Sequence, residues 1–288
     1  MNIAIPITFI TPCFCRGADC SDNGAPEIRP ASIRGQLHWW FRALGGTSRE
    51  ENAVFGNVHG GTTASRLVVR VKYDMNASYR QSPTLPHKTG GPAAPKQAFA
   101  PGVGFELLLS TRLGGLSTDH EKKLLRALNA WLHLGALGLR ATRGDGNFTW
   151  AADAAAASGV LPPPATAEAY TAAVATITNG TMLRAALLDK QYPNAEYARK
   201  DITNTLGDRA FGGAAPLGKA IGGRKTSPLR FRVVKFGDGN FRIAAVWDGR
   251  SEVTGNTDAD LRDAIEKLRR AGKPVGVQLA RSPFARKQ

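Results

Sequence analysis

The stretch Arg29-Pro-Ala-Ser-Ile-Arg-Gly-Gln-Leu-His-Trp-Trp-Phe-Arg-Ala-Leu44 decides how the rest of the chain is organised. We predict a helix that begins at Ser32, because a serine hydroxyl can accept a hydrogen bond from an unpaired N–H of the first turn. Gly45 and Gly46 predict its end. At 100° per residue, one face carries the apolar side chains that we expect to pack on the core, namely Ile33, Leu37, Trp40, Phe41 and Leu44.

Another side of the same helix is cationic. Arg34, His38 and Arg42 follow one another at a spacing of four, and Trp39 points away from the apolar face. Two interpretations are open. In the first, the arginines are solvated and Trp39 packs on a neighbouring loop. In the second, the cations contact phosphates and Trp39 stacks on a base, which would make this side an RNA-binding surface.

The composition is that of a basic globular chain. Its 288 residues are enough for one large domain or two of ordinary size. The chain has 38 lysines and arginines and 23 aspartates and glutamates, so its net charge is +15. This charge favours a polyanionic partner and leaves open whether that partner is a nucleic acid or an anionic surface.

Membrane association is disfavoured by the pattern of apolar residues. Every apolar run is shorter than the roughly 18 residues that a membrane-spanning helix needs. A long basic amphipathic helix, typical of proteins that lie on a membrane, is also missing from the pattern. Residues 1–6 lack the basic start of a signal peptide. We therefore expect no membrane partner and a cytoplasmic location.

The first half of the chain predicts one complete α+β unit. The strand-like segments are 3–14, 64–73, 104–112 and 147–150, and the helical ones are 32–44 and 118–134. Thr118 and Glu121 have the spacing of a capping box at the start of the second helix. Residues 74–101 predict a long loop. The order β-α-β-β-α-β is typical of the ferredoxin-like, or RRM-like, fold.

The second half predicts a smaller unit of the same kind. The segment 151–167 is alanine-rich and then proline-rich, which is typical of a linker, and it places a domain boundary between residues 1–155 and 156–288. Beyond it the pattern predicts helix over 167–188, a basic glycine-rich stretch over 199–227, a hairpin of 229–236 with 241–247, and a helix over 257–271. This content indicates a second ferredoxin-like unit that is incomplete or decorated.

Several blocks of this sequence resemble one protein family. They are Ile10–Asp19, Pro26–Leu44, Glu51–Gly56, Leu134–Phe148 and, more weakly, Lys225–Phe231. In this order they are similar to the first Cmr subunit of type III-B CRISPR effectors, a member of the RAMP superfamily of guide-RNA-binding proteins. The resemblance implies a non-catalytic subunit that binds guide and target RNA in antiviral defence. It also implies other Cmr and RAMP subunits as partners, and a position capping the backbone filament near the 3′ end of the guide.

Nuclease activity is the first alternative. Asp19 and Asp22 follow the first strand, and in related RAMP backbone subunits a loop aspartate near this place serves in metal-dependent cleavage of target RNA. Two carboxylates alone do not define a metal site, and both residues are equally typical of turns. A second alternative is a protein–protein scaffold whose positive charge serves acidic partners.

We predict neither a metal nor a cofactor. Cys13, Cys15 and Cys20 have C-x-C-x4-C spacing, which is unlike a zinc knuckle, so we expect free thiols. The segment 213–220 resembles a phosphate-binding P-loop, but Ala220 stands where a magnesium-binding hydroxyl is required.

Several of the predicted RNA-binding residues combine positive charge with a neighbouring glycine. A glycine lets a phosphate approach the backbone amides while the cation supplies charge. Taken singly, each cluster is more typical of a solvated loop, and the total charge with the RRM-like order favours RNA. No base-reading code is visible, so we expect sequence-independent binding. The predicted residues are Arg16, Arg29, Arg34, His38, Trp39, Arg42, Arg140, Arg143, Lys219, Arg224 and Lys225.

Overall fold

The first half of the chain folds into a four-stranded antiparallel sheet. The computed structural model describes residues 1–17, 19, 21, 24–58, 62–74, 76–86, 95–112, 114–207, 227–270 and 277–279. The strands of this sheet are β1 (Asn2–Phe9), β2 (Leu67–Lys72), β5 (Gly104–Thr111) and β6 (Phe148–Trp150). Their order in space is β2-β5-β1-β6. With the helices between them, this is the ferredoxin-like arrangement that the sequence predicted.

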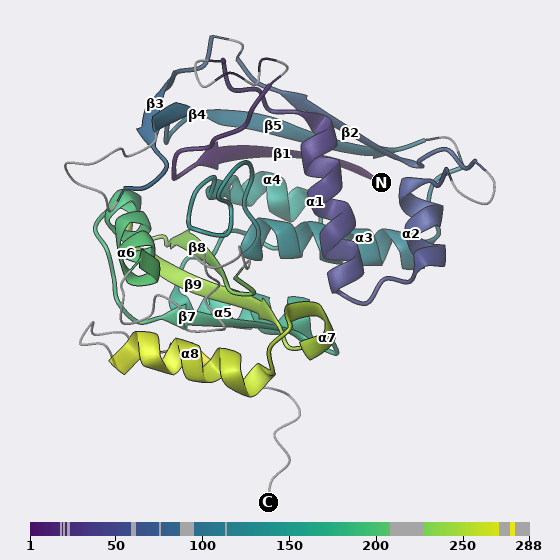
Figure 1. Ribbon diagram of the computed structural model, residues 1–288. Helices are drawn as coiled ribbons and strands as arrows, with labels where there is room; N and C mark the ends of the chain where they lie inside the picture. Colours follow the sequence, from purple (N-terminus) through teal and green to yellow (C-terminus); the bar gives the residue numbers. More distant parts are fainter. Residues whose placement is uncertain are drawn as a thin grey trace, which may run out of the picture.

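Helices cover the face of this sheet that is turned toward the second half of the chain (Figure 1). They are α1 (Pro30–Ala43), α2 (Ser48–Phe55), α3 (Thr118–Leu134) and α4 (Ala152–Ala157). Side chains along β1 alternate between exposed and buried, because successive residues of a strand point to opposite faces. The buried face meets the apolar stripe of α1, whose Ile33, Leu37 and Trp40 are fully buried.

The second half builds another sheet with the same topology. It contains β7 (Leu183–Leu188), α6 (Ala195–Gly207), β8 (Arg230–Lys235), β9 (Phe241–Asp248), α8 (Asp258–Arg270) and β10 (Val277–Leu279). The strands lie in the order β10-β7-β9-β8, which repeats the order of the first sheet. The unit is decorated by α5 (Ala167–Thr178) and α7 (Ser251–Thr254). Of the two alternatives, an incomplete or a decorated second unit, the structure has the decorated one.

Two strands of this sheet, β7 and β10, are additional to the predicted hairpin, and β7 lies in a segment where the sequence predicts helix. Residues 183–188 read Leu-Arg-Ala-Ala-Leu-Leu, which are good helix formers, and the sequence predicted one helix over 167–188. The structure ends α5 at Thr178 and forms β7 between β9 and β10. Five of the six β7 residues are buried, so packing on both faces outweighs intrinsic propensity.

Other boundaries also differ from the prediction. The first helix begins at Pro30 with Arg29 as its N-cap, because proline is well suited to a first helical position, where no N–H partner is needed. The N-cap of α3 is Ser117, which accepts a hydrogen bond from the His120 amide at 3.3 Å. Within the predicted loop 74–101, β3 (Tyr79–Pro83) pairs with β4 (Pro95–Phe99).

A continuous core joins the two units. In the sequence, the two sheets fall on either side of residues 155 and 156, yet α5 packs on α3. Val234 of β8 and Phe236, which directly follows that strand, belong to the same buried cluster as residues of α1 and α3. The segment between the sheets is itself packed, since Ala155 is fully buried and the Trp150 indole N–H donates to the Leu161 carbonyl at 3.0 Å. Across the described residues, the helices are too short or too polar to span a membrane.

Candidate nucleic-acid interface

The polar side of α1 faces α2. His38 Nε2 lies 2.9 Å from Oε1 of Glu51, and Arg42 Nη1 lies 3.3 Å from Oε2 of the same carboxylate. A capping box of Thr47 and Glu50 starts α2, and Glu51 is the residue that follows it. The His38 and Arg42 side chains remain 46% and 44% exposed. This side of α1 is therefore half open and partly neutralised, rather than freely solvated.

Arg34 is held at the end of α2. Its Nη2 donates to the carbonyl of Phe55, the last residue of that helix, and its guanidinium lies 5.9 Å from the centroid of the Phe55 ring. A cation at a helix C-terminus is favourable because the last carbonyls carry partial negative charge. Arg34 is consequently half-buried and has a structural role, because it joins α1 to the end of α2.

Trp39 packs on the second unit. Its ring makes an edge contact with Trp40, with centroids 4.7 Å apart, and the guanidinium of Arg230 from β8 stacks on it at 3.9 Å. Together with Trp247 and residues of α7 it lines a cavity of about 300 Å³. Trp39 therefore packs on a neighbouring segment, as the first of the two interpretations expects, but its partner is Arg230 of strand β8 and not a residue of a loop.

The glycine-rich loop between α3 and β6 pairs with β8 at Phe231. Its residue Thr142 accepts a hydrogen bond from the Phe231 amide at 3.1 Å, and the Gly144 amide donates to the Phe231 carbonyl at 3.2 Å. Gly146 has φ +62°, and a Cβ there would lie 1.7 Å from the Leu137 carbonyl oxygen, so only glycine fits. The loop is thus held beside β8 by backbone hydrogen bonds.

A buried charge cluster fixes the same loop. Asp145 is fully buried and pairs with the equally buried Arg199 of α6, while Arg140 Nε lies 3.7 Å from its other oxygen. Burial raises the pKa of the Asp145 carboxyl to about 7, although both guanidiniums oppose the shift. Burial also lowers the pKa of Arg143 to about 10, and that side chain stays charged at neutral pH. Only part of the charge predicted at Arg140 and Arg143 is therefore available to a ligand.

Residues from three of the segments predicted to bind RNA line one groove. It has a volume of about 280 Å³ and is lined by Phe14, Cys15, Arg16, Arg29, Ser32, Gly138 and Leu139. These residues come from the segment after β1, the start of α1 and the glycine-rich loop. In the described structure, the first turn of α1 has no acidic residue and its N-cap side chain makes no capping hydrogen bond. A helix start of this kind, beside Arg16 and Arg29, favours an anion.

Asp19 is exposed, and its carboxylate accepts a hydrogen bond from the Ser21 amide at 2.8 Å. This bond lowers the pKa of Asp19 and is typical of a turn. Across the described residues, no group of three His, Cys, Asp or Glu side chains could hold a metal ion. The other predicted site residues, Asp22, Lys219, Arg224 and Lys225, lie outside the described residues, as do Cys20 and the segment 213–220.

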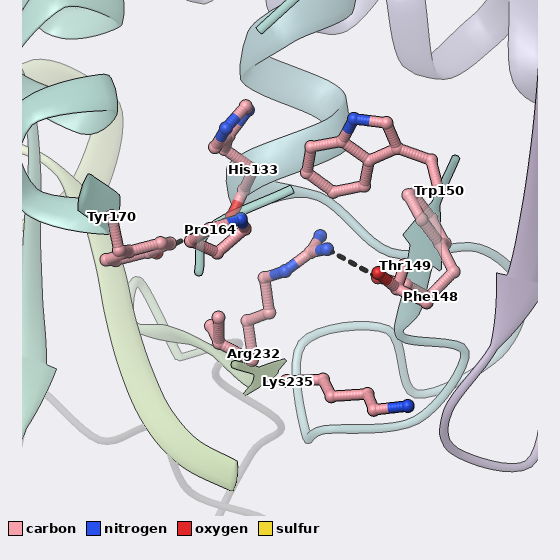
Figure 2. A pocket seen from close by; sticks show the side chains of 9 residues that line it. His133, Phe148, Thr149, Trp150, Pro164, Tyr170, Arg232 and Lys235 are labelled. Atoms are coloured by element: carbon pink, nitrogen blue, oxygen red, sulfur yellow. Dashed lines mark hydrogen bonds between the residues drawn. The ribbon is translucent and has the colours of Figure 1, made fainter. Parts of the chain in front are cut away.

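Two arginines of β8, Arg230 and Arg232, join the two units and were not among the predicted site residues. Figure 2 shows Arg232 reaching from β8 to the end of α3 and to β6. It is 3% exposed, donates to the Gly135 carbonyl, and donates to the Phe148 carbonyl at 2.9 Å. The alternation of Arg230 and Arg232 with apolar residues in the segment 229–236 was the available signal, since it places both arginines on one face of a strand.

His133 lies beside Arg232 in the same small cavity (Figure 2). Its Nδ1 donates to the Asn129 carbonyl at 2.9 Å. Burial, with a smaller contribution from Arg232, lowers the pKa of His133 to about 4. The side chain is therefore neutral in the folded protein at pH 7.

We expect acid to destabilise the fold through His133. The unfolded chain takes up this proton near pH 6.5 and the folded chain only near pH 4, so between these values the unfolded state binds more protons. Relative to a His133→Gln variant, the wild type should lose about 2 kcal/mol of unfolding free energy between pH 7 and pH 5. Urea unfolding at both pH values measures this, and parallel losses in the two proteins would contradict it.

Comparisons with known proteins place these features in a family. A model described as "RAMPs: RAMP superfamily" matches residues 6–149. "CRISPR system Cmr subunit Cmr1-2" of Pyrococcus furiosus is 29% identical over 179 residues, which cover 48% of this chain and 89% of that protein. "CRISPR system Cmr subunit Cmr1-1" of the same organism is 30% identical over 145 residues, which cover 43% of this chain and 40% of that protein.

Solved structures share the whole fold. The crystal structure of Cmr1 from Pyrococcus furiosus in its apo form superposes with a TM-score of 0.65 at 18% identity, covering 96% of this chain and 98% of that one. A chain in the cryo-EM structure of a type III-B Cmr-beta bound to cognate target RNA gives a TM-score of 0.59 at 11% identity, covering 93% and 98%. At these identities the likeness establishes the shared two-unit fold.

Proposed function

The chain belongs to the RAMP superfamily, and from that premise we propose that it is a Cmr1-type subunit of a type III-B CRISPR ribonucleoprotein. It binds guide and target RNA in antiviral defence, together with other Cmr and RAMP subunits, in the cytoplasm. It caps the backbone filament near the 3′ end of the guide and does not itself cleave RNA. The relatives named Cmr1-1 and Cmr1-2, and the similar chain in a complex with cognate target RNA, support this proposal.

The groove beside the start of α1 carries the proposal. It brings Arg16 and Arg29 together at a helix N-terminus with Gly138 of the glycine-rich loop. Phosphate is the anion that such a surface fits, because helix N–H groups and guanidiniums both donate hydrogen bonds to its oxygens. A single strand of RNA passing here would contact the half-exposed His38 and Arg42 further along the same helix.

We expect an Arg16→Ala/Arg29→Ala variant to bind single-stranded RNA more weakly and with a weaker salt dependence. With fewer phosphate contacts, fewer counterions are released when RNA binds. The magnitude of the slope of log K against log salt should therefore fall by about 1 to 2. Fluorescence anisotropy with a labelled RNA at several salt concentrations measures both quantities. The effect should be similar for RNAs of different sequence, because the contacts are to the backbone.

An Arg70→Ala/Arg80→Ala variant is the matched control. Both arginines are exposed and lie on β2 and β3, outside the groove, so removing them changes the net charge equally. Equal losses in the two variants would show that only total charge matters and would refute the groove. The same samples incubated with Mg²⁺ should leave the RNA intact, and cleavage that disappears in Asp19→Ala would refute the non-catalytic role.

A further inference from the structure

Two buried thiols lie in contact below the groove. The Sγ atoms of Cys13 and Cys15 are 3.0 Å apart, while Cys13 Sγ is also 3.5 Å from the Leu137 carbonyl oxygen. A disulfide has its sulfurs about 2.05 Å apart, so the pair needs to close by roughly 1 Å. Since no third metal ligand accompanies them among the described residues, covalent chemistry between the two sulfurs is the use that this arrangement fits.

The two thiols differ in access. Cys15 is 7% exposed and lines the 280 Å³ groove, whereas Cys13 is fully buried behind it. A small oxidant that enters the groove therefore meets Cys15 first. Burial raises the pKa of the Cys13 thiol well above its usual range, so Cys13 is the less reactive of the two toward an oxidant in solution, and its contact with the Cys15 sulfur is what places it to react with an oxidised Cys15.

We propose that Cys13 and Cys15 form a peroxide-sensitive dithiol that closes to a disulfide and weakens RNA binding in the adjoining groove. Cys15 attacks hydrogen peroxide, its sulfur is oxidised to a sulfenic acid, and one water leaves. Cys13 then attacks that sulfur, the S–O bond breaks, and a second water leaves. Two thiols thus give two electrons and two protons to one peroxide, and a dithiol reductant reverses the change by thiol–disulfide exchange.

Formation of the Cys13–Cys15 disulfide would shift the glycine-rich loop. The Leu139 amide donates to the Phe14 carbonyl at 2.9 Å, and a Cβ on Gly138 would lie 2.8 Å from that same carbonyl oxygen and 3.2 Å from Cys15 Sγ. The loop therefore rests directly on the segment that closure must displace. Because Gly138 and Leu139 line the groove, its shape changes with the segment. This coupling rests on the proposed RNA binding, whereas disulfide formation does not.

The test uses the full chain in a Cys20→Ser background, so that the third cysteine cannot exchange. After treatment with hydrogen peroxide and alkylation, mass spectrometry of the peptide that holds both cysteines should show the loss of two hydrogen atoms, reversed by dithiothreitol. RNA affinity measured on the same samples should fall by about fivefold on oxidation, the lower end of usual coupling between sites, and recover on reduction.

A Cys13→Ser/Cys20→Ser variant is the control, because its Cys15 has no partner thiol. Its oxidised form should show no disulfide and should keep more of its RNA affinity than the oxidised dithiol. A peptide that keeps both thiols, or goes directly to a sulfinic acid at Cys15, overturns the proposal. A disulfide that leaves RNA affinity unchanged overturns the coupling. If the reduced protein binds no RNA, the proposed function fails while the mass measurement still decides the disulfide.

Discussion

Arg232→Met is expected to lower the free energy of unfolding by about 3–5 kcal/mol, because two buried carbonyls lose a charged donor. The guanidinium donates to the carbonyls of Gly135 and Phe148, and its plane lies over the Phe148 ring at 5.0 Å. Gly135 is the C-cap residue of α3, so the guanidinium also interacts favourably with the partial negative charge at that end of the helix. Methionine fills much of the volume but can satisfy neither carbonyl.

Lys235→Met is the matched control for Arg232→Met. Lys235 lies on the same strand and is exposed, so its replacement should leave stability close to that of the wild type. Urea unfolding monitored by tryptophan fluorescence compares the three proteins at one pH. Equal midpoints for Arg232→Met and Lys235→Met would show that the buried guanidinium does not hold the units together. Arg232→Lys should fall between, since an ammonium lacks the planar fork that reaches both carbonyls.

Breaking the Asp145–Arg199 pair is expected to weaken RNA binding, although neither residue lines the groove. The two side chains are 0% and 1% exposed. Asp145→Asn or Arg199→Met removes one partner of a buried, charge-assisted hydrogen bond and should cost about 3–5 kcal/mol. The glycine-rich loop then loses its anchor to α6, and RNA affinity should fall about tenfold or more.

A double-mutant cycle separates this pair from its surroundings. If the two charges act as a unit, Asp145→Asn/Arg199→Met should be less destabilised than the sum of the single variants. Glu196→Gln is the control, because Glu196 contacts the same guanidinium at 2.9 Å with a side chain that is 53% exposed, and it should change little. Additive losses, or single variants that bind RNA as the wild type does, would contradict the anchoring role.

The candidate site was predictable in its residue types and only partly in its geometry. Charge and glycine spacing pointed to Arg16, Arg29 and the glycine-rich loop, and the structure brings these together in one groove. For Arg34, His38 and Arg42 the sequence predicts a side of the helix that is open to solvent or RNA. It could not foresee that Phe55 and Glu51 of α2 contact them, since α2 follows α1 after a four-residue turn that sets its direction.

Local periodicity by itself determined the apolar stripe of α1, the hairpin of β8 with β9 and the order of elements in the first unit. Such patterns are written in residues a few positions apart, and burial of one face follows directly from them. Tertiary structure decided that residues 183–188 form a central strand and that Arg232 joins the units. Its two acceptors lie 97 and 84 positions away in the sequence. A charged side chain becomes a structural one only where folding brings its partners to it and excludes water, which no local pattern encodes.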